Sequence, residues 1–295
     1  MPEHTPAYLD AAADAAATVL ADHPDYRILR RLRDAAQLAS PAPANTPTRV
    51  AAVVDVETTG LDAASNRIIE LAIQRFRFTA PGQITEVGLA RSWREDPGFP
   101  LDPTITKLTG LTDADVAGQA INDVEATAML ASADVIIAHN AKFDAKFVEA
   151  RLPAVAGQAW ACTLNEIAWP EHGFAGRQLG HLLMEAGYFF AGHRAAEDVL
   201  ALIFLLAHRP HDGAPLLANL IARAEQPAVR IDAIGADYDS KDLLKARGYR
   251  WEATGRYWSI EVPEHAAEAE QLWLQHNACR HGARMTRVTW RERHR

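Results

Sequence analysis

The chain has 295 residues, 48% of them apolar, and a formal net charge of −8. This composition is ordinary for a globular protein with a sizeable core, and it argues against a protein that grips phosphates mainly through a basic surface. It still allows a site that holds phosphate through metal ions, because such a site needs carboxylates. The sequence shows no signal peptide and no membrane-spanning run, and its two cysteines are far apart. We therefore expect a reduced, cytoplasmic protein without a membrane partner.

The first part of the chain predicts an N-terminal helical segment over residues 1–40. Apolar side chains recur at helical spacing on both sides of Pro24, which predicts two helices. Residues 41–48 follow as a Pro-rich linker without a periodic apolar pattern. The valine-rich run RVAAVVDVE, beginning at Arg49, then predicts a buried strand that opens the main domain, to which we assign residues 49–224.

Apolar runs and helical periodicity in the main domain predict an α/β fold. Strands are expected over residues 49–57, 67–78, 85–94, 134–139 and 159–164. Helices are expected over residues 122–132, 143–151, 177–187, 194–208 and 214–224. Strands that come first and then alternate with helices predict a mixed five-stranded sheet flanked by helices.

A small α+β module is predicted over residues 228–277. It begins with a strand, continues with a helix that Gly248 ends, and contains a hairpin around a T-G turn before a last helix. Residues 278–295 form an Arg-rich tail with two open interpretations, a nucleic-acid contact or a solvated, disordered end.

Three clusters of polar residues carry the candidate chemistry. In D-V-E-T-T-G (55–60), the two acids are spaced i and i+2 at the end of the first strand and therefore point to the same face. H-N-A-K-F-D (139–144) follows a predicted strand and opens a helix, and H-R-A-A-E-D (193–198) precedes an apolar helix. Each cluster alone has an ordinary explanation, such as a solvated strand edge or a helix cap. Two adjacent carboxylates favour a divalent cation as the counter-charge.

Taken together, the order and spacing of these clusters resemble the DEDDh family of 3′→5′ exonucleases, typified by the proofreading subunit of bacterial DNA polymerase III. The likeness covers about residues 49–208 and extends to PTITKLTGLT (103–112) and RQLGHLLMEAG (177–187). The resemblance implies a ribonuclease-H-like fold, two bound Mg²⁺ or Mn²⁺ ions and release of nucleoside 5′-monophosphates. One departure is Thr109, which stands where many relatives carry histidine, so the substrate contacts of that loop stay open.

The resemblance also assigns roles in catalysis. Asp55 would bridge both ions, Glu57 and Asp198 would complete one ion's ligands, and Asp144 would help to hold the other. His193 would be the general base. A histidine with a pKa near 6.5 can take a proton from water at neutral pH.

The expected substrate contacts lie next to the acids. Thr58 and Leu61 match positions where relatives contact the terminal nucleotide, with Leu61 as a wedge against the last base. A backbone amide near Thr58 or Thr59 would meet the 3′-hydroxyl. Asn140 and Phe143, beside Asp144, complete the candidate substrate-binding set.

Several alternatives remain open from the sequence. The expected partner is nucleic acid with a free 3′ end, and DNA is favoured as the substrate. One alternative is an exoribonuclease that acts on short RNA or RNA 3′ ends. An alternative from another functional class is a non-catalytic nucleic-acid-binding module. No segment marks a polymerase-binding site, and residues 271–275 match a clamp-binding pentapeptide only without its final aromatic. The hairpin aromatics Trp251, Tyr257 and Trp258 can stack on bases or form the module's core. We expect residues 228–295 to tune substrate engagement.

Overall fold

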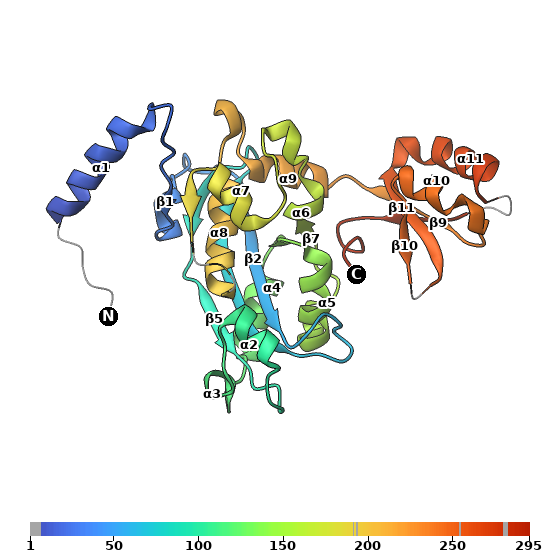
Figure 1. Ribbon diagram of the computed structural model, residues 1–295, viewed down its shortest axis with the longest axis horizontal. Coiled ribbons are helices and arrows are strands. Elements are labelled where there is room, and N and C mark those ends of the chain that lie inside the picture. The colour runs from blue at the N-terminus through green and yellow to red at the C-terminus, as the bar shows by residue number, and fades with distance from the viewer. Residues whose placement is uncertain (1–6, 191, 193, 254, 280–282) are drawn as a thin grey trace.

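The computed structural model describes residues 7–190, 192, 194–253, 255–279 and 283–295 (Figure 1). A central α/β domain carries an N-terminal segment on one side and a separate C-terminal lobe on the other. Within the described residues, no helix is both long and apolar enough to cross a membrane.

The central sheet is mixed, as predicted. Its strands run in the order β4 (Ile84–Val87), β3 (Ile68–Thr79), β2 (Thr48–Thr58), β6 (Val135–Ala138) and β7 (Trp160–Cys162), and β5 (Arg91–Arg94) also pairs with β3. The pairs β2–β3, β3–β4 and β3–β5 are antiparallel, whereas β2–β6 and β6–β7 are parallel.

Helices cover both faces of this sheet, as predicted. The longer ones are α4 (Asp123–Ala131), α5 (Ala141–Arg151), α8 (Ala195–Ala207) and α9 (Leu216–Ala224); the shorter ones are α2 (Pro103–Thr109), α3 (Asp113–Val116), α6 (Thr163–Glu166) and α7 (Leu179–Glu185). Ala51 and Val53 of β2 join the core formed with α7, α8 and α9, while Ala52 and Val54 join the core formed with α4 and α5. The two-residue period of a strand thus explains why β2 is apolar at consecutive positions.

The predicted strand over residues 85–94 is split in two. Gly88 leaves the ladder between β4 and β5: its N–H donates to the carbonyl of Arg75 and its own carbonyl accepts from Gln74 Nε2. Leu89, which follows, is 79% exposed. The sheet therefore has one more strand than predicted, although its mixed architecture is unchanged.

The N-terminal segment holds one predicted helix, α1 (Ala7–Ala21), but the second predicted helix is wrong. Residues after Pro24 form the two-residue strand β1 (Arg30–Arg31), which pairs in parallel with β8 (Tyr188–Phe189), and a 3₁₀ helix (Ala35–Leu38). Leu32 and Ala35 are buried against the α8 side of the core. Tertiary packing and pairing to β8 thus override the helical spacing of the sequence.

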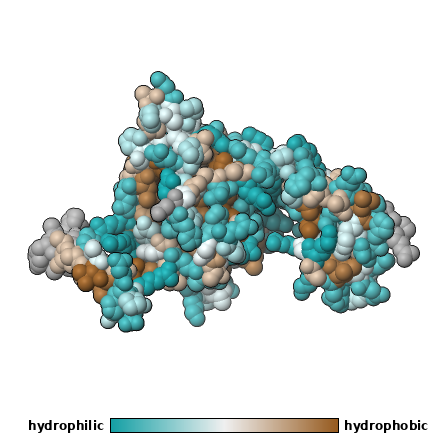
Figure 2. All heavy atoms as spheres, turned by 90° about the horizontal axis from the view of Figure 1, so that it is seen from above, coloured by the Kyte–Doolittle hydropathy of each residue, from teal (hydrophilic) through white to brown (hydrophobic). Residues whose placement is uncertain are grey.

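The C-terminal module is an α+β unit, as predicted. Its antiparallel sheet has the order β10 (Arg250–Glu252), β11 (Tyr257–Pro263), β9 (Ala228–Ala233) and β12 (Arg284–Val288), and it packs against α10 (Lys241–Ala246) and α11 (Ala267–Asn277). Further 3₁₀ helices are Pro153–Val155, Trp169–His172, Pro210–Asp212, Tyr238–Ser240 and Glu264–Ala266. Trp258 packs on the module's core, whereas Trp251 is 51% exposed. Figure 2 shows the module as the right-hand lobe, with apolar patches among polar atoms.

The described residues of the Arg-rich tail are folded, so the interpretation as a disordered end is wrong for them, while a nucleic-acid contact stays a prediction. β12 lies within the tail and pairs with β9, so the module's sheet extends beyond residue 277. Arg284 donates to the fully buried Asp232, and Arg293 pairs with Glu166 of the central domain at 2.5 Å. Both arginines form ion pairs with buried acids of the same chain, and these pairs hold the tail against the rest of the protein.

Candidate active site

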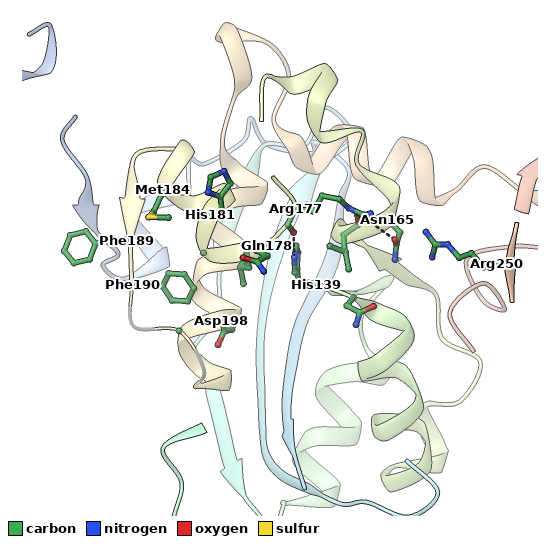
Figure 3. Close-up of a pocket in the computed structure, with 15 residues that line it drawn as sticks. His139, Asn165, Arg177, Gln178, His181, Met184, Phe189, Phe190, Asp198 and Arg250 are labelled. Carbon is green, nitrogen blue, oxygen red and sulfur yellow. Dashed lines mark hydrogen bonds between the residues drawn. The ribbon is translucent and has the colours of Figure 1, made fainter. Parts of the chain in front are cut away.

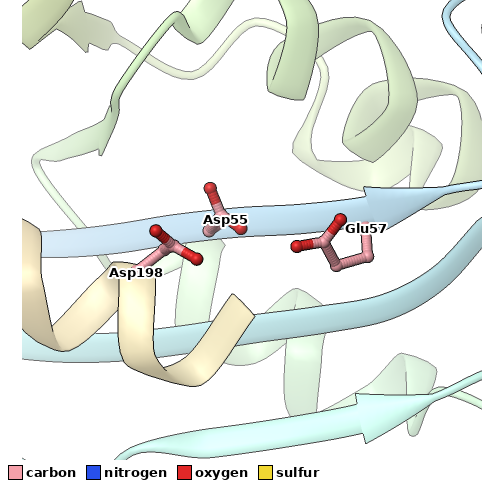
Figure 4. Close-up of side chains that lie close together, drawn as sticks. All are labelled: Asp55, Glu57 and Asp198. Atoms are coloured by element: carbon pink, nitrogen blue, oxygen red, sulfur yellow. The ribbon is translucent and has the colours of Figure 1, made fainter. Parts of the chain in front are cut away.

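Three of the predicted acids come together at the end of β2. Asp55 and Glu57 share one face of β2, and Asp198 lies in the first turn of α8, which packs on the same face (Figure 4). One potential ligand atom from each of the three lies within 4.8 Å of the others. The group can therefore offer oxygen ligands to one divalent cation.

Packing of α8 fixes the position of Asp198. Val199 and Leu202, on the following turns, are buried in the core that β2 contributes to through Val53. At the start of the helix, the backbone N–H of Arg194 donates to Asp198 Oδ2 at 3.2 Å. The acid is thus held at the N-terminal end of a helix whose apolar face anchors it to the sheet.

The carboxylates raise one another's proton affinity. Burial, followed by the charges of Asp144, Asp198 and Glu57, raises the pKa of Asp55 well above its usual range. Burial, then the charges of Asp198 and Glu70, raises the pKa of Glu57 to about 7. Like charges held this close disfavour their ionised forms unless a cation is present. Without a cation, the site therefore retains protons at neutral pH that the ordinary carboxylate pKa values would not allow.

Asp144 lies close to this group but outside it. The structure places it in the first turn of α5, where it is only 3% exposed. Burial raises its pKa to about 8, although the backbone amides of Asp144 and Val56 partly offset this effect. Its charge acts on Asp55, so the two are neighbours electrostatically. This placement is compatible with a second cation beside the first.

A fifth acid, Glu70, was missed by the sequence reasoning. It stands directly opposite Glu57 in the β2–β3 register and is 3% exposed. Its Oε2 accepts from the backbone N–H of Ala195 at 3.1 Å and lies 3.6 Å from Arg194 Nε, while Ser92 Oγ donates to its Oε1 at 3.4 Å. Glu70 thus ties β3 to the start of α8. A lone acid inside the apolar run RIIELAI was the available signal.

The two motif histidines differ in what the structure describes. His193 lies outside the described residues, so its role stays a prediction. His139 Nε2 donates to the carbonyl of Arg177 at 2.9 Å, and its Nδ1 is 2.8 Å from Thr163 Oγ1, which donates to it. Burial lowers the pKa of His139 to about 4, so this ring is neutral at pH 7. His139 therefore serves as a fixed structural link between β6 and α6.

The predicted substrate-side residues surround the acids with different exposures. Leu61 is 87% exposed in the loop after β2, as a wedge requires, whereas Thr58 is buried and donates to the carbonyl of Gly60. The N–H of Thr59 already donates to the carbonyl of Arg67, so that amide is committed within the loop. Asn140 is exposed in a left-handed conformation, with φ of 85° and no side-chain cap.

Two further positions have structural explanations. Phe143 is half-buried, with its ring 4.9 Å from that of Phe147. Thr109 is 2% exposed; its hydroxyl donates to the carbonyl of Ile105 and accepts from the N–H of Leu111. Thr109 therefore closes the end of α2, and both bonds of its buried hydroxyl are made within this segment.

A cavity of about 930 Å³ opens beside the acids (Figure 3). Asp198 and Asn140 line it together with Met184 of α7, Phe189 of β8 and Phe190, which follows β8. At its far side lies Arg250, which belongs to the C-terminal module. The volume is in the range of sites that enclose small organic ligands.

Comparison with known proteins places this site in a family. The RNase_T family model, described as an exonuclease, matches residues 52–206. The PolC-type DNA polymerase III of Streptococcus agalactiae is 38% identical over 101 residues, which are 33% of this chain and 6% of that protein. The Streptococcus thermophilus protein of the same name is 37% identical over 102 residues, with the same shares. The chain thus spans only a small part of these relatives.

Solved structures with a similar course of the chain have low sequence identity. Exonuclease X in complex with 5′ overhanging duplex DNA is 21% identical, with a TM-score of 0.42 over 53% of this chain and 89% of that one. Escherichia coli exonuclease I in complex with a dA16 oligonucleotide is 17% identical, with a TM-score of 0.46 over 83% of this chain and 64% of that one.

The family match runs from within β2 to near the end of α8. It contains the three acids that the structure brings together, the buried Asp144 and most of the mixed sheet of the main domain. The resemblance stated from the three sequence clusters is thereby confirmed. The chain belongs to the RNase_T exonuclease family.

Proposed function

We propose that the protein is a divalent-metal-dependent 3′→5′ exonuclease that hydrolyses phosphodiester bonds of nucleic acid and releases nucleoside 5′-monophosphates. One observation carries the proposal: Asp55, Glu57 and Asp198 offer ligand atoms within 4.8 Å of one another. Carboxylates so close repel one another without a counter-charge. An all-oxygen donor set suits hard cations such as Mg²⁺ and Mn²⁺ and lacks the nitrogen or sulfur ligands typical of zinc sites.

The residues fit a two-ion arrangement in the following way. The charges of Asp198 and Asp144 both act on Asp55, which suits a ligand shared by the two ions. Glu57 and Asp198 would hold one ion with it, and Asp144 the other. A pair of such ions would stabilise the attacking and leaving oxygens of an in-line displacement at phosphorus. His193 would take the proton of the attacking water, since His139 is already committed to Arg177 and Thr163.

The substrate is proposed to be DNA. The relatives that match at 38% and 37% identity are DNA polymerases by name, which favours DNA over RNA. Because the match spans 6% of those proteins, no association with a polymerase or clamp is proposed from it. A non-catalytic binding module is disfavoured, because the chain retains Asp55, Glu57, Asp144 and Asp198 in one crowded site.

The decisive experiment compares strands labelled at either end. Single-stranded DNA and RNA of equal sequence, labelled at the 3′ or the 5′ end, are incubated with Mg²⁺, with Mn²⁺ or with excess chelator. We expect a labelled mononucleotide to appear first from the 3′-labelled DNA and a ladder of shortened products from the 5′-labelled DNA. Full turnover in chelator, or early mononucleotide from the 5′ label, would contradict the proposal. Faster turnover of the RNA than of the DNA would show that RNA, and not DNA, is the preferred substrate.

We also propose that the protein works in a reducing compartment such as the cytoplasm. Cys162 is buried in the central domain's core and Cys279 in that of the C-terminal module. Burial also raises the pKa of the Cys162 thiol, which favours the unreactive protonated form.

A further inference from the structure

The cavity beside the acids does not end within the exonuclease domain. Its lining passes from Asp198 and Phe190 through Gln178 and Asn165 to Arg250 on β10 of the C-terminal module. Figure 3 shows Arg250 reaching from the module's strand toward Asn165. The family match ends at residue 206, so this part of the wall is a feature of this chain's own C-terminal region.

The direction of Arg250 follows from the alternation of its strand. Arg250 and Glu252 are two residues apart on β10 and therefore share a face. Glu252 Oε1 lies 3.3 Å from Lys142 Nζ, and Lys142 belongs to the same short segment as Asn140 and Asp144. The face of β10 that carries Arg250 is thus turned toward the catalytic domain. The exposed Trp251 lies on the opposite face.

A second, independent contact fixes the module in this position. After β12, the chain returns to the central domain, where the carbonyl of Trp290 accepts from the N–H of Trp160 at the edge strand β7. Arg293, 11% exposed, pairs with Glu166, 6% exposed. Because one contact joins Glu252 to Lys142, two residues from Asn140 in the lining, and the other lies at the sheet edge, the packing of the two domains holds Arg250 in the cavity wall.

The lining has the chemistry of a single-strand track. Phe189, Phe190, Met184 and Leu164 offer apolar and aromatic surface on which bases can stack. Arg177, also in the lining, is bonded to the carbonyl of Leu164 and to Asn165. In the described part of the chain, no ion pair of Arg250 is found, so its guanidinium can take a phosphate.

A cation at the position of Arg250 matters because the protein as a whole is acidic. The net charge is −8, and the acids at one end of the cavity repel a polyanion wherever no cation intervenes. The region from Lys241 onward holds eleven basic residues against seven acids, but Arg284, Arg287, Arg293 and Arg295 are paired with acids. Most of the excess basic residues of this region are therefore paired with acids of the same chain. Arg250 is the cation that the module contributes to the cavity lining.

We propose that the DNA strand upstream of its 3′-terminal nucleotide runs through this cavity and that Arg250 binds one of its phosphates. The C-terminal module then forms the far end of the substrate site and makes cleavage depend on strand length. This inference rests on the proposed function, because it takes the acids to mark where the 3′ end lies.

The test uses the full-length protein and single substitutions. Arg250→Ala and Arg250→Lys are compared with Lys245→Ala, which removes the same charge from the exposed side of α10, away from the cavity lining. The Michaelis constant is measured on single-stranded DNA of about 3 and about 16 nucleotides, lengths that bracket typical single-strand site sizes. Binding of the longer strand is measured by fluorescence anisotropy at several salt concentrations with Ca²⁺ in place of Mg²⁺.

We expect Arg250→Ala to raise the Michaelis constant on the longer strand about tenfold relative to the shorter one, the size of a lost charge-assisted hydrogen bond. The salt slope of binding should fall by about 0.7, which corresponds to one phosphate contact on a single strand. Arg250→Lys should recover part of both effects, and Lys245→Ala should leave both at wild-type values.

The outcomes separate this inference from the proposed function. If wild type degrades DNA but Arg250→Ala behaves like Lys245→Ala in both length dependence and salt slope, the track is wrong and the nuclease assignment stands. If Arg250→Ala affects both lengths equally, its role is structural and the track is likewise overturned. If wild type binds the longer strand with an Arg250-dependent salt slope but cleaves nothing, the proposed function fails while the binding site stands.

Discussion

The active site and the C-terminal tail place charged side chains in buried surroundings in opposite ways. At the end of β2, Asp55, Glu57 and Asp198 face one another, and the pKa values of Asp55 and Glu57 are raised. In the tail, Arg293 meets Glu166 and the pair is almost completely buried. A partly buried cluster of one sign favours binding of a cation, whereas a buried pair of opposite signs already balances its charges within the fold. The arrangement of charges thus distinguishes a candidate metal-binding site from a stabilising ion pair without reference to sequence motifs.

The largest expected effect is on the acids themselves. Asp55→Asn or Asp198→Asn should abolish cleavage, because each removes a ligand from the group, while the fold survives. In the metal-free protein, Asp55→Asn should raise the melting temperature, because it removes one of several repelling charges. Activity assays and thermal melts in chelator check both parts. Asp239→Asn, an exposed acid of the module, is the control that should change neither. Near-normal turnover of both site variants would refute the assignment.

Next in size is the effect of the predicted general base. His193→Ala should lower the rate by roughly 10²–10⁴-fold, the usual range for loss of a general base, while metal binding persists. Wild-type activity should rise with pH as the histidine loses its proton near pH 6.5. A pH–rate profile of wild type and variant checks this. A rate independent of pH between about 5.5 and 8 would speak against a histidine base.

A smaller effect is expected at Glu70, which bonds to the start of α8 and is not one of the three clustered acids. Glu70→Gln keeps the shape but weakens the link to Ala195 and Arg194, so Asp198 is held less firmly. We expect the affinity for Mn²⁺ to fall about 10–100-fold, with activity restored at high Mn²⁺. Titration of activity with Mn²⁺ separates this from a structural defect, which added metal would not rescue. Glu86→Gln, exposed on β4, is the matched control.

The smallest effect on activity, but a clear one on stability, is expected in the tail. Arg293→Ala leaves the buried Glu166 with His294 and the N–H of Cys162 but without its guanidinium partner, and it should lower the free energy of unfolding by about 3–5 kcal/mol. Arg287→Ala removes an exposed ion pair of the same tail and should cost about 0–1 kcal/mol. Denaturant unfolding of the two variants measures the difference. Equal losses in the free energy of unfolding would show that the Arg293–Glu166 contact stabilises the protein no more than an exposed ion pair does.

The same pair predicts a pH dependence. Burial alone would raise the pKa of Glu166, but His294, the N–H of Cys162 and Arg293 together lower it. A carboxylate with a lowered folded-state pKa stabilises the fold above its unfolded pKa, and this contribution is lost as the pH falls. The stability gap between wild type and Arg293→Ala should therefore be full above about pH 4.3 and shrink below it. A gap that grows on acidification would contradict this sign.

The sequence predicted what depends on local spacing. The shared face of Asp55 and Glu57 follows from the period of a strand, and Asp198 follows from the start of an apolar helix. Glu70 could not be placed in this way, because its position opposite Glu57 depends on the register between β2 and β3. Spacing along one segment says nothing about which residue of a neighbouring strand stands opposite.

The errors have the same origin. Arg293 and Arg295 find Glu166 and Glu149 more than a hundred positions away, so their partners are invisible in a local count of charges. Leu32 was assigned to a helix, yet its N–H bonds to the carbonyl of Phe189. These contacts also mean that truncation near residue 226 would strip Trp290 and Arg293 from the central domain. Point variants at Arg250 therefore test substrate engagement more cleanly than truncation does.

The most direct test of the central claim is calorimetric titration of the metal-free protein with Mn²⁺ in buffers of different ionisation enthalpy. The pKa values of Glu57 and Asp144, raised to about 7 and about 8, leave these groups partly protonated near pH 7. We predict that Mn²⁺ binding releases protons from the site, and that Asp55→Asn weakens the binding. No binding to wild type, or binding without proton release that is unchanged in Asp55→Asn, would contradict the account.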